Sequence, residues 1–559
     1  MAATPFACLA ELGERLEATT KRTEMATLLA DFLRELQPEE IRPAVRLTIG
    51  QIFAEWDERS LNLSVGAAMD VVEELVDASP TVRDEVAAQA VDPGHRAYLL
   101  LDAARKAPPV PPALTILDVF QTFEQVAETS GRGSRARKHA LLGTLLERAT
   151  AVEAKYLVRI LFQEMRHGVN EGVMLTGIAE AAHVKPALVR RANQLWGEVG
   201  EVALVALTEG RDGLRRATLR LFRPIKPMLA QTADDIQEPF RRFDGRVALE
   251  FKLDGARVQI HSRDSEVRIY SRNLSDVTAS LPDVAAEIRA LLGDREAIVE
   301  GEAVAVDSEG RPLPFQHLMR RFRRKHDVAA TTEEIPVQLY LFDALYLDRA
   351  SLIDEPNHAR WAALQQAVDG TDLVPRLVTT DVEQAETFAG QARRAGHEGV
   401  MAKDPESTYT PGVRGKSWLK LKHVTSLDLA IVAADWGYGR RHGWLSNYHL
   451  AVRDEESGRF LVVGKTYKGL TDDQFREMTE HLLALEESRA RGTVFVQPRV
   501  VVEVLFNEIQ ESSQYESGFA LRFARVSRIR DDKRASDTDT LDTLQELYED
   551  QFRYKGRLE

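Results

Sequence analysis

The first 215 residues carry apolar side chains at spacings of three and four, the pattern of helices with one buried face. The spacing is clear in two segments, Met25, Leu28, Leu29, Phe32, Leu33 and Leu36, and Tyr156, Leu157, Ile160, Leu161 and Met165. Strand-like alternation is scarce here, so the pattern predicts an all-α domain over residues 1–220. A proline-rich connector, Pro108–Pro112, is expected to join two helical sub-bundles.

After residues 223–230 the period changes to short alternating runs, which are typical of strands. The runs are VALEFKL, ARVQIHSR, EVRIYSR, AIVEGEAVAV and VQLYLFDALYL, and helical stretches such as VAAEIRALLG and HARWAALQQAV lie between them. We therefore expect an α+β domain with antiparallel strands over residues 221–425. Residues 426–559 are β-rich around one expected helix near 472–488, which favours a small β-barrel of the OB-fold type.

Composition limits the class of protein further. The 559 residues have a net charge of −14, which alone argues against binding to a polyanion, although a binding face is local. The single cysteine, Cys8, excludes a disulfide framework and a cysteine-based zinc site, and it suits a reducing cytosol. The first residues are too charged by Glu11 for a signal peptide, and no apolar run reaches about 18 residues, so no membrane span is expected.

The segment EFKLDGAR, residues 250–257, is the most informative stretch of the chain. Asp254–Gly255 between alternating runs is a strong signal for a hairpin turn. On the strand before this turn, Glu250 and Lys252 share one face, so a lysine and a carboxylate meet at the tip of a sheet. Taken alone, this pair is more often a structural ion pair than a reactive lysine.

Four further segments place polar or aromatic side chains on strands or at their ends: Glu300 and Glu302, Glu398 and Lys403, Lys420 and Lys422, and Phe342. Together they supply oxygen ligands for Mg²⁺, cations for phosphate and an apolar surface for a base, as a nucleoside triphosphate site requires. No GxxxxGK[ST] loop accompanies them, so a P-loop NTPase is not expected.

Seven motifs follow one another in order: Lys252–Gly255 with Arg257, Ser271–Asn273, Glu300–Glu302, Phe342, Glu398–Lys403, Ser417–Lys422 and Leu521–Lys533. With this set, the chain resembles the ATP-dependent DNA ligases of the covalent nucleotidyltransferase superfamily, of the type with a helical N-terminal DNA-binding domain. RPIKPMLA, PFQHLMRR and LFQEMRHGV also resemble ligase segments, so the likeness covers nearly the whole chain.

The resemblance implies a nick-sealing reaction in three steps. Lys252 attacks the α-phosphate of the substrate ATP, AMP passes to the 5′-phosphate at the nick, and the 3′-hydroxyl displaces AMP. The resemblance also implies a role for each site residue. Glu250 recognises adenine, Phe342 stacks on it, and Arg257 contacts the ribose. Arg272 contacts a phosphate, and Lys420 and Lys422 hold the α-phosphate. Glu302 and Glu398 bind the ribose or the catalytic Mg²⁺, for which Mn²⁺ is an alternative, and Asp254 lies close to the metal and is available for the DNA steps. Because a free lysine is protonated at pH 7, metal or cationic groups are expected to lower the pKa of Lys252.

The basic run of the last motif has two readings. The run is either a solvated strand face or a basic group that is brought over ATP when the C-terminal domain closes. For Arg530 and Lys533 the motif match favours the second reading. For Arg522, Arg525 and Arg528, the sequence does not distinguish contacts to ATP from contacts to DNA. Since one face cannot cover ATP and grip DNA at once, we expect a swing about a hinge near Thr425–Ser426.

DNA binding by an acidic chain requires local basic patches. Three runs qualify, residues 131–138, 211–223 and 311–326, each with several Lys or Arg and at most one acid. Spread over the chain, they favour contacts to the phosphates of a nicked duplex without sequence readout. We expect a monomer that acts on the nucleoid in a prokaryotic cytoplasm; no clear sliding-clamp peptide is present, so a clamp partner stays open.

Alternatives remain within and outside the superfamily. An RNA ligase or a capping enzyme shares the lysine chemistry but lacks such a helical domain, and an NAD-dependent ligase carries a four-cysteine zinc site that one cysteine cannot supply. A non-catalytic nick-binding scaffold would not need Lys252. The choice between replication and repair, and the strictness for ATP over ADP or GTP, stay open, as do the roles of residues 326–337 and of the proline-rich connector.

Overall fold

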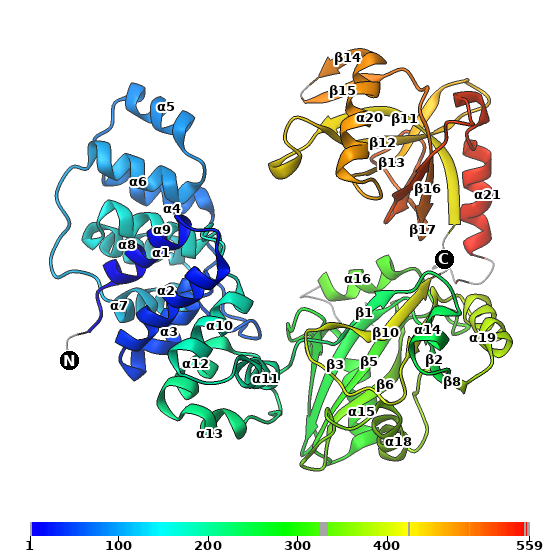
Figure 1. The fold of residues 1–559 in the computed structure, drawn as a ribbon, viewed down its shortest axis with the longest axis horizontal. Coiled ribbons are helices and arrows are strands. Elements are labelled where there is room, and N and C mark those ends of the chain that lie inside the picture. The colour runs from blue at the N-terminus through cyan, green and yellow to red at the C-terminus, as the bar shows by residue number, and fades with distance from the viewer. Residues whose placement is uncertain (1–2, 324–333, 423–424, 491, 553–554, 556–559) are drawn as a thin grey trace.

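The computed structural model describes residues 3–323, 334–422, 425–490, 492–552 and 555, and the side chains of Arg323 and Lys422 lie outside this description. The ribbon has three lobes, a helical domain, a central domain of two sheets and a β-rich C-terminal domain (Figure 1). The predicted fold class is therefore confirmed. None of the helices in the described ranges is long and apolar enough to cross a membrane.

The helical domain shares one apolar core, to which nearly all of its helices contribute. Thr115 and Thr150 begin two of the helices with capping boxes, which satisfy free backbone amides. The predicted periodic segment from Tyr156 extends past its helix, because the chain turns after Leu161. The helices are α1 (Phe6–Glu17), α2 (Arg22–Glu35), α3 (Pro38–Thr48), α4 (Val65–Glu74), α5 (Pro80–Gln89), α6 (Pro93–Ala104), α7 (Ile116–Glu128), α8 (Ser134–Arg148), α9 (Ala151–Leu161), α10 (Glu171–Ala181), α11 (Pro186–Trp196), α12 (Val199–Thr208) and α13 (Gly210–Arg215).

The first sheet of the central domain has the order β1-β10-β9-β2-β8. Its strands are β1 (Leu229–Thr232), β2 (Val247–Lys252), β8 (Arg376–Thr379), β9 (Gly399–Lys403) and β10 (Arg414–Lys422). Helix α19 (Val382–Arg394) packs its apolar side chains against one face of this sheet. Phe240 of α14 (Glu238–Arg242) packs against the same apolar cluster. The opposite face is left for polar side chains.

The second sheet has the order β4-β3-β5-β6-β7. Its strands are β3 (Ala256–Arg263), β4 (Glu266–Ser271), β5 (Ala297–Ala305), β6 (Val337–Leu347) and β7 (Ala350–Ser351). The helices α15 (Pro282–Leu292) and α18 (Asn357–Ala367) contribute to its core, and α16 (Phe315–Arg323) follows β5. The alternation of the sequence predicted β3 and β6 residue for residue.

The C-terminal domain is built on β11, a long strand that pairs with β12, β15 and β16. Its elements are β11 (Thr425–Trp436), β12 (Leu445–Arg453), β13 (Phe460–Thr466), α20 (Asp472–Ala484), β14 (Glu486–Ala490), β15 (Thr493–Val496), β16 (Val501–Phe506), β17 (Glu508–Glu511), β18 (Phe519–Arg522), β19 (Arg525–Ile529) and α21 (Leu541–Gln551). The helix expected near 472–488 therefore ends at Ala484, and α21 was not foreseen.

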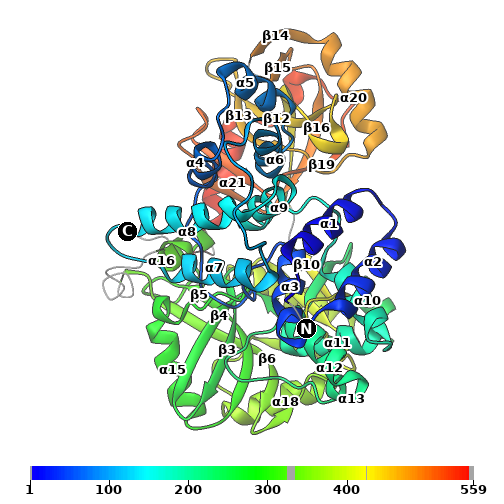
Figure 2. The same cartoon turned by 90° about the vertical axis from the view of Figure 1, so that its left-hand side faces the viewer.

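The central domain contacts both of the others. In the view turned by 90°, the helical domain lies in front of the central domain, with the C-terminal domain above (Figure 2). Arg191 of α11 donates to Asp354 of the central domain at 2.6 Å. Thr425 and Ser426, the expected hinge, begin β11 and lie opposite Phe506 and Leu505 of β16.

Candidate active site

The strand register of the first sheet brings three of the charged candidate residues to one face of the sheet. Glu250 lies opposite Met401, and Met401 lies opposite Lys420, while Lys252 lies opposite Gly399. Residues opposite one another across strands share a face, so Glu250, Lys252 and Lys420 point the same way. The alternation had predicted this for Glu250 and Lys252 alone. The backbone of Lys422 continues the row, but its side chain is not described.

The second sheet supplies the facing groups. Arg257 of β3 lies opposite Glu302 of β5, and the register of β5 and β6 shifts by one residue beside Phe342. The Arg257 guanidinium lies 5.3 Å from the Phe342 ring centroid, and the Lys403 ammonium of the first sheet lies 4.7 Å from it. The ring is thus contacted by cations from both sheets, and the candidate site lies between them.

Lys252, the last residue of β2, forms an ion pair with Glu398. Burial alone would lower the pKa of the Lys252 ammonium, but attraction to Glu398 and, more weakly, to Glu302 and Asp254 raises it above its usual value. The expectation that neighbouring groups lower this pKa is therefore wrong for the site without ligands. The nearest groups are carboxylates, and they hold the proton on the amine.

Glu302 is the most perturbed carboxyl group of this cluster. Burial raises its pKa to about 7; Lys252 and Arg257 oppose the change, and repulsion from Glu398 and Asp254 adds to it. A half-protonated carboxyl beside a second carboxylate gains from a bound cation. In the described part of the chain no three acidic, His or Cys side chains are grouped as a complete metal site. Two carboxylates nevertheless suit Mg²⁺, which usually keeps waters and binds substrate phosphates as well.

Glu250 is almost fully buried, and both of its oxygens are engaged. Arg376 donates to one oxygen at 2.7 Å, and Lys403 lies 2.6 Å from the other. Its predicted contact with adenine would use the remaining lone pairs.

Three side chains of the site had no role assigned from the sequence. Lys403 was singled out with Glu398 at the ends of one strand, and its parity with Met401 places it on the polar face. Tyr409 accepts from Arg257 at 3.2 Å and donates to Glu300 at 2.9 Å, and Trp418 lies beside it. No sequence signal marked Tyr409, and Trp418 lay within the motif Ser417–Lys422.

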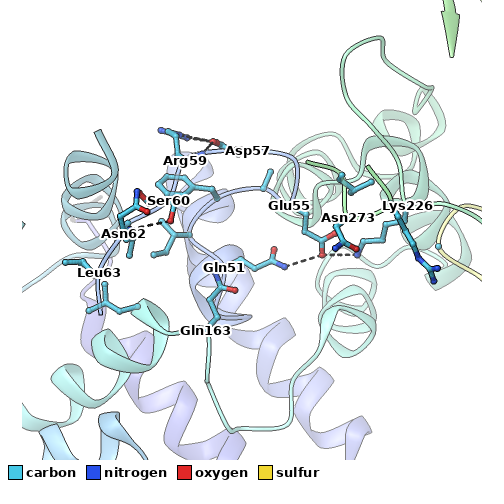
Figure 3. A pocket seen from close by; sticks show the side chains of 18 of the residues that line it. Gln51, Glu55, Asp57, Arg59, Ser60, Asn62, Leu63, Gln163, Lys226 and Asn273 are labelled. Atoms are coloured by element: carbon cyan, nitrogen blue, oxygen red, sulfur yellow. Dashed lines mark hydrogen bonds and ion pairs between the residues drawn. The ribbon is translucent and has the colours of Figure 1, made fainter. Parts of the chain in front are cut away.

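Arg272 lies apart from this cluster. Together with Asn273 it lines a pocket of about 880 Å³ between the central domain and the helical-domain loop of residues 51–63. Figure 3 shows Glu55 of this loop approached by Gln51 and by Lys226, whose ammonium lies 3.0 Å from it. The side chain of Arg272 is exposed, so it is available to a ligand in this pocket.

Asp254 faces the C-terminal domain. The Lys555 ammonium donates to it at 2.8 Å and to Glu508 at 3.0 Å, and Glu508 also accepts from Arg522 at 2.9 Å. These alternating charges border a pocket of about 240 Å³ between the two domains.

Arg530 and Lys533 are not brought to Lys252. Both bind Asp428, near the start of β11, and Arg530 also donates to Asp532 at 2.7 Å. Their predicted place over ATP would require the C-terminal domain to move, so that role stays a prediction.

Several cations of the three basic runs have partners within the protein, and the expected contacts of these runs with DNA stay a prediction. Lys138 is buried and donates to the Leu61 carbonyl at 2.6 Å, and Arg321 is buried against Asp283 at 2.6 Å. Arg220 and Arg223 both bind Glu201 at 2.7 Å. The residues after Arg323 in the third run lie outside the description. A run of like charges does not reveal acids elsewhere in the chain.

The central domain, with its paired sheets and lysine-centred polar face, is a nucleotidyltransferase domain. Three family profiles match in order: DNA ligase N terminus over residues 5–179, ATP dependent DNA ligase domain over residues 227–422, and ATP dependent DNA ligase C terminal region over residues 441–533. The chain belongs to the family of ATP-dependent DNA ligases.

Curated relatives match over their full length. The chain is 43% identical to DNA ligase 1 of Korarchaeum cryptofilum over 98% of each chain, and 42% identical to a probable DNA ligase of Anaeromyxobacter dehalogenans over 97% of this chain and 99% of that one. The solved structure named Pmar-Lig_Pre has a TM-score of 0.58 at 16% identity, over 94% of this chain and 99% of that one. This likeness concerns the fold alone.

Proposed function

We propose that this enzyme seals nicks in duplex DNA with ATP, through a covalent Lys252–AMP intermediate. One observation carries the proposal: Lys252 ends a strand in an ion pair with Glu398, on the same sheet face as Lys420 and in the electrostatic reach of Glu302. A lysine at such a position has both a base nearby and cations for a phosphate.

In the first step the unprotonated Lys252 amine attacks the α-phosphorus of ATP. A P–N bond forms, the P–O bond to pyrophosphate breaks, and the amine loses a proton. Arg257 would hold the ribose and Phe342 would stack on adenine, with Glu250 at the base edge. Lys420 and Lys422 would balance charge on the α-phosphate.

Glu302 and Glu398 would hold Mg²⁺, or Mn²⁺ in its place, and the metal would neutralise phosphate charge when bound. Glu398 then has less attraction left for the Lys252 ammonium. Because this attraction raises the pKa of Lys252, its weakening favours the free amine. Glu398 thus couples cation binding to activation of the nucleophile.

In the second step an oxygen of the 5′-phosphate at the nick attacks the AMP phosphorus, the P–N bond breaks, and Lys252 regains a proton. In the third step the 3′-hydroxyl attacks that 5′-phosphate and AMP leaves. Arg272 would contact a phosphate, and Asp254 would serve these DNA steps once Lys555 has left it. A monomer that holds the duplex through phosphates suffices for this chemistry.

Arg530 and Lys533 would orient the leaving pyrophosphate in the first step. This role requires them to exchange Asp428 for the nucleotide as the C-terminal domain moves.

The test is intact-mass spectrometry after incubation with ATP and Mg²⁺. The wild-type chain should gain one AMP, and Lys252→Ala should gain none while it still binds a nicked duplex. Lys416→Ala, which changes an exposed lysine of the same sheet, is the matched control and should adenylate normally. AMP retained on Lys252→Ala would overturn the assignment.

A further inference from the structure

The segment from Phe222 to Met228, here called the linker, joins the helical domain to β1 and runs along one side of β3. Three side chains at alternate positions of β3 meet its backbone at every third residue. His261 meets Phe222, Gln259 meets Ile225, and Arg257 meets Met228. Alternate residues of a strand share a face, so these three side chains form one ladder.

The His261 rung has a defined tautomer. The amide of Phe222 donates to His261 Nδ1 at 2.9 Å, so the ring hydrogen is on Nε2, which lies 3.0 Å from Gln259 Oε1. Burial lowers the pKa of His261 to about 3, which keeps the ring neutral at working pH. The Tyr270 hydroxyl adds a bond to the Phe222 carbonyl at 3.1 Å.

The Gln259 rung pairs with both polar groups of one linker residue. Its carbonyl oxygen accepts from the Ile225 amide at 2.9 Å, and its amide nitrogen donates to the Ile225 carbonyl at 3.2 Å. Gln259 is 4% exposed, so its loss would leave buried backbone groups without partners.

The Arg257 rung belongs to the candidate active site. Its guanidinium donates to the Met228 carbonyl at 2.7 Å and to Glu300 at 2.7 Å, and it also lies against Phe342. The Met228 amide donates to Tyr409 at 2.9 Å, so the end of the linker is fixed within the site.

The other side of the connection holds the helical domain. Arg220, Arg223 and Lys226, again three residues apart, bind acids of that domain. The first two share Glu201, and Lys226 lies 2.8 Å from Glu171 and 3.0 Å from Glu55, the latter contact being visible in Figure 3. Side chains therefore attach this segment to the helical domain, while its backbone is attached to β3.

We propose that Gln259 and His261 are positioning residues for the DNA steps: by holding the linker backbone, they fix the helical domain relative to Lys252 and the nucleotide. The proposal rests on the proposed function, because it requires a nucleotide beside Arg257 and DNA on the helical domain. In the proposed first step the reacting groups lie in the central and C-terminal domains, so this step does not depend on the Gln259 and His261 rungs. Binding and sealing of the nick do.

The experiment compares full-length Gln259→Leu with Ser262→Ala. Ser262 is buried on the same strand, and its side chain points to the opposite face, so its substitution controls for effects on the central domain. We expect Gln259→Leu to self-adenylate within twofold of wild type. Its KM for a pre-adenylated nick should rise at least tenfold, and chymotrypsin should cut after Phe222 several times faster. Ser262→Ala should match wild type in all three measurements.

Tyr270→Phe provides a milder test should Gln259→Leu fold poorly, since it removes the bond to the Phe222 carbonyl and leaves Gln259 and His261 in place. It should raise the same KM by about two- to threefold with unchanged self-adenylation. Equal losses in self-adenylation and sealing, or an unchanged KM in both variants, would overturn the positioning role. Failure of the proposed function would look different, because the wild-type chain itself would then gain no AMP.

Discussion

The Lys555 ammonium lies 2.8 Å from the Asp254 carboxylate, although 301 residues separate the two. Asp254 is two residues from the nucleophile, and Lys555 follows the last helix of the C-terminal domain. The pair therefore holds that domain in an arrangement in which Arg530 and Lys533 bind Asp428 instead of a nucleotide.

Removal of this pair should speed the first step. A substitution Lys555→Ala takes away about 1 kcal/mol of interdomain attraction, enough to change an equilibrium between domain arrangements about fivefold. We expect the rate of Lys252 adenylation, measured by quenched flow with labelled ATP, to rise by a factor of two to five. Lys465→Ala, which removes an ion pair within the C-terminal domain, is the control. A slower or unchanged rate in the Lys555 variant would show that this arrangement does not restrain the first step.

The pH dependence of the Lys252 amine should report the Glu398 ion pair. Because Glu398 raises the pKa of Lys252, the free amine increases about tenfold per pH unit until the pH reaches that raised pKa. In Glu398→Gln the reactivity profile should move to lower pH by about one pH unit or more. The measurement is acylation of Lys252 by an amine-selective reagent without metal or nucleotide, with exposed Lys416 in the same digest as the internal standard. Superimposable profiles would contradict the pairing.

Glu302 should make stability depend on pH and on metal. Its folded pKa, about 7, lies above the ordinary value of 4.5, so the folded state binds the proton more tightly. This contribution to stability is present below about pH 4.5 and is lost as the pH rises through 7. With chelator present, Glu302→Gln should therefore melt about 2–4 °C above wild type at pH 8.5 and close to it at pH 5.

Addition of Mg²⁺ at pH 8.5 should then stabilise wild type but not Glu302→Gln. Exposed Glu477→Gln should behave as wild type throughout. An equal response to Mg²⁺ in all three proteins would remove Glu302 from the metal site.

Two cations of the first basic run should behave differently. Lys138 is buried on the Leu61 carbonyl, so Lys138→Met should lower the free energy of unfolding of the helical domain by about 1–3 kcal/mol. Arg135 is exposed, and Arg135→Ala should leave stability unchanged but reduce the slope of log Kd against log salt for nicked DNA by about 0.9, if it contacts a phosphate. Denaturant unfolding and a salt titration separate the two effects.

Local sequence patterns predicted most of the fold. Strands β3 and β6 were predicted at their full length because alternation depends only on neighbouring residues. Alternation also paired Glu250 with Lys252 and Lys420 with Lys422, while the common face of Lys252 and Lys420 follows from the strand register. The end of α20 was missed because Glu486 begins a strand that the charged sequence EESRA does not suggest.

The long-range electrostatics could not be predicted in the same way. Lys252 and Glu398 are 146 residues apart, so the sign of the pKa change depends on a pairing that no local pattern encodes. The partners of cations in the basic runs are equally distant along the chain: Lys138 binds the Leu61 carbonyl and Arg321 binds Asp283. Lys403 was placed at the end of its strand, but its burial against Glu250 depends on a pairing with another strand that local alternation does not encode.

The three-residue spacing of the linker implies a constraint on length more than on identity. The peptide groups of Phe222, Ile225 and Met228 are held on one side, and the side chains of Arg223 and Lys226 are held on the other. One inserted or deleted residue would put both sets of anchors out of phase with their partners, so related ligases and engineered fusions should reject changes in the number of residues in this segment.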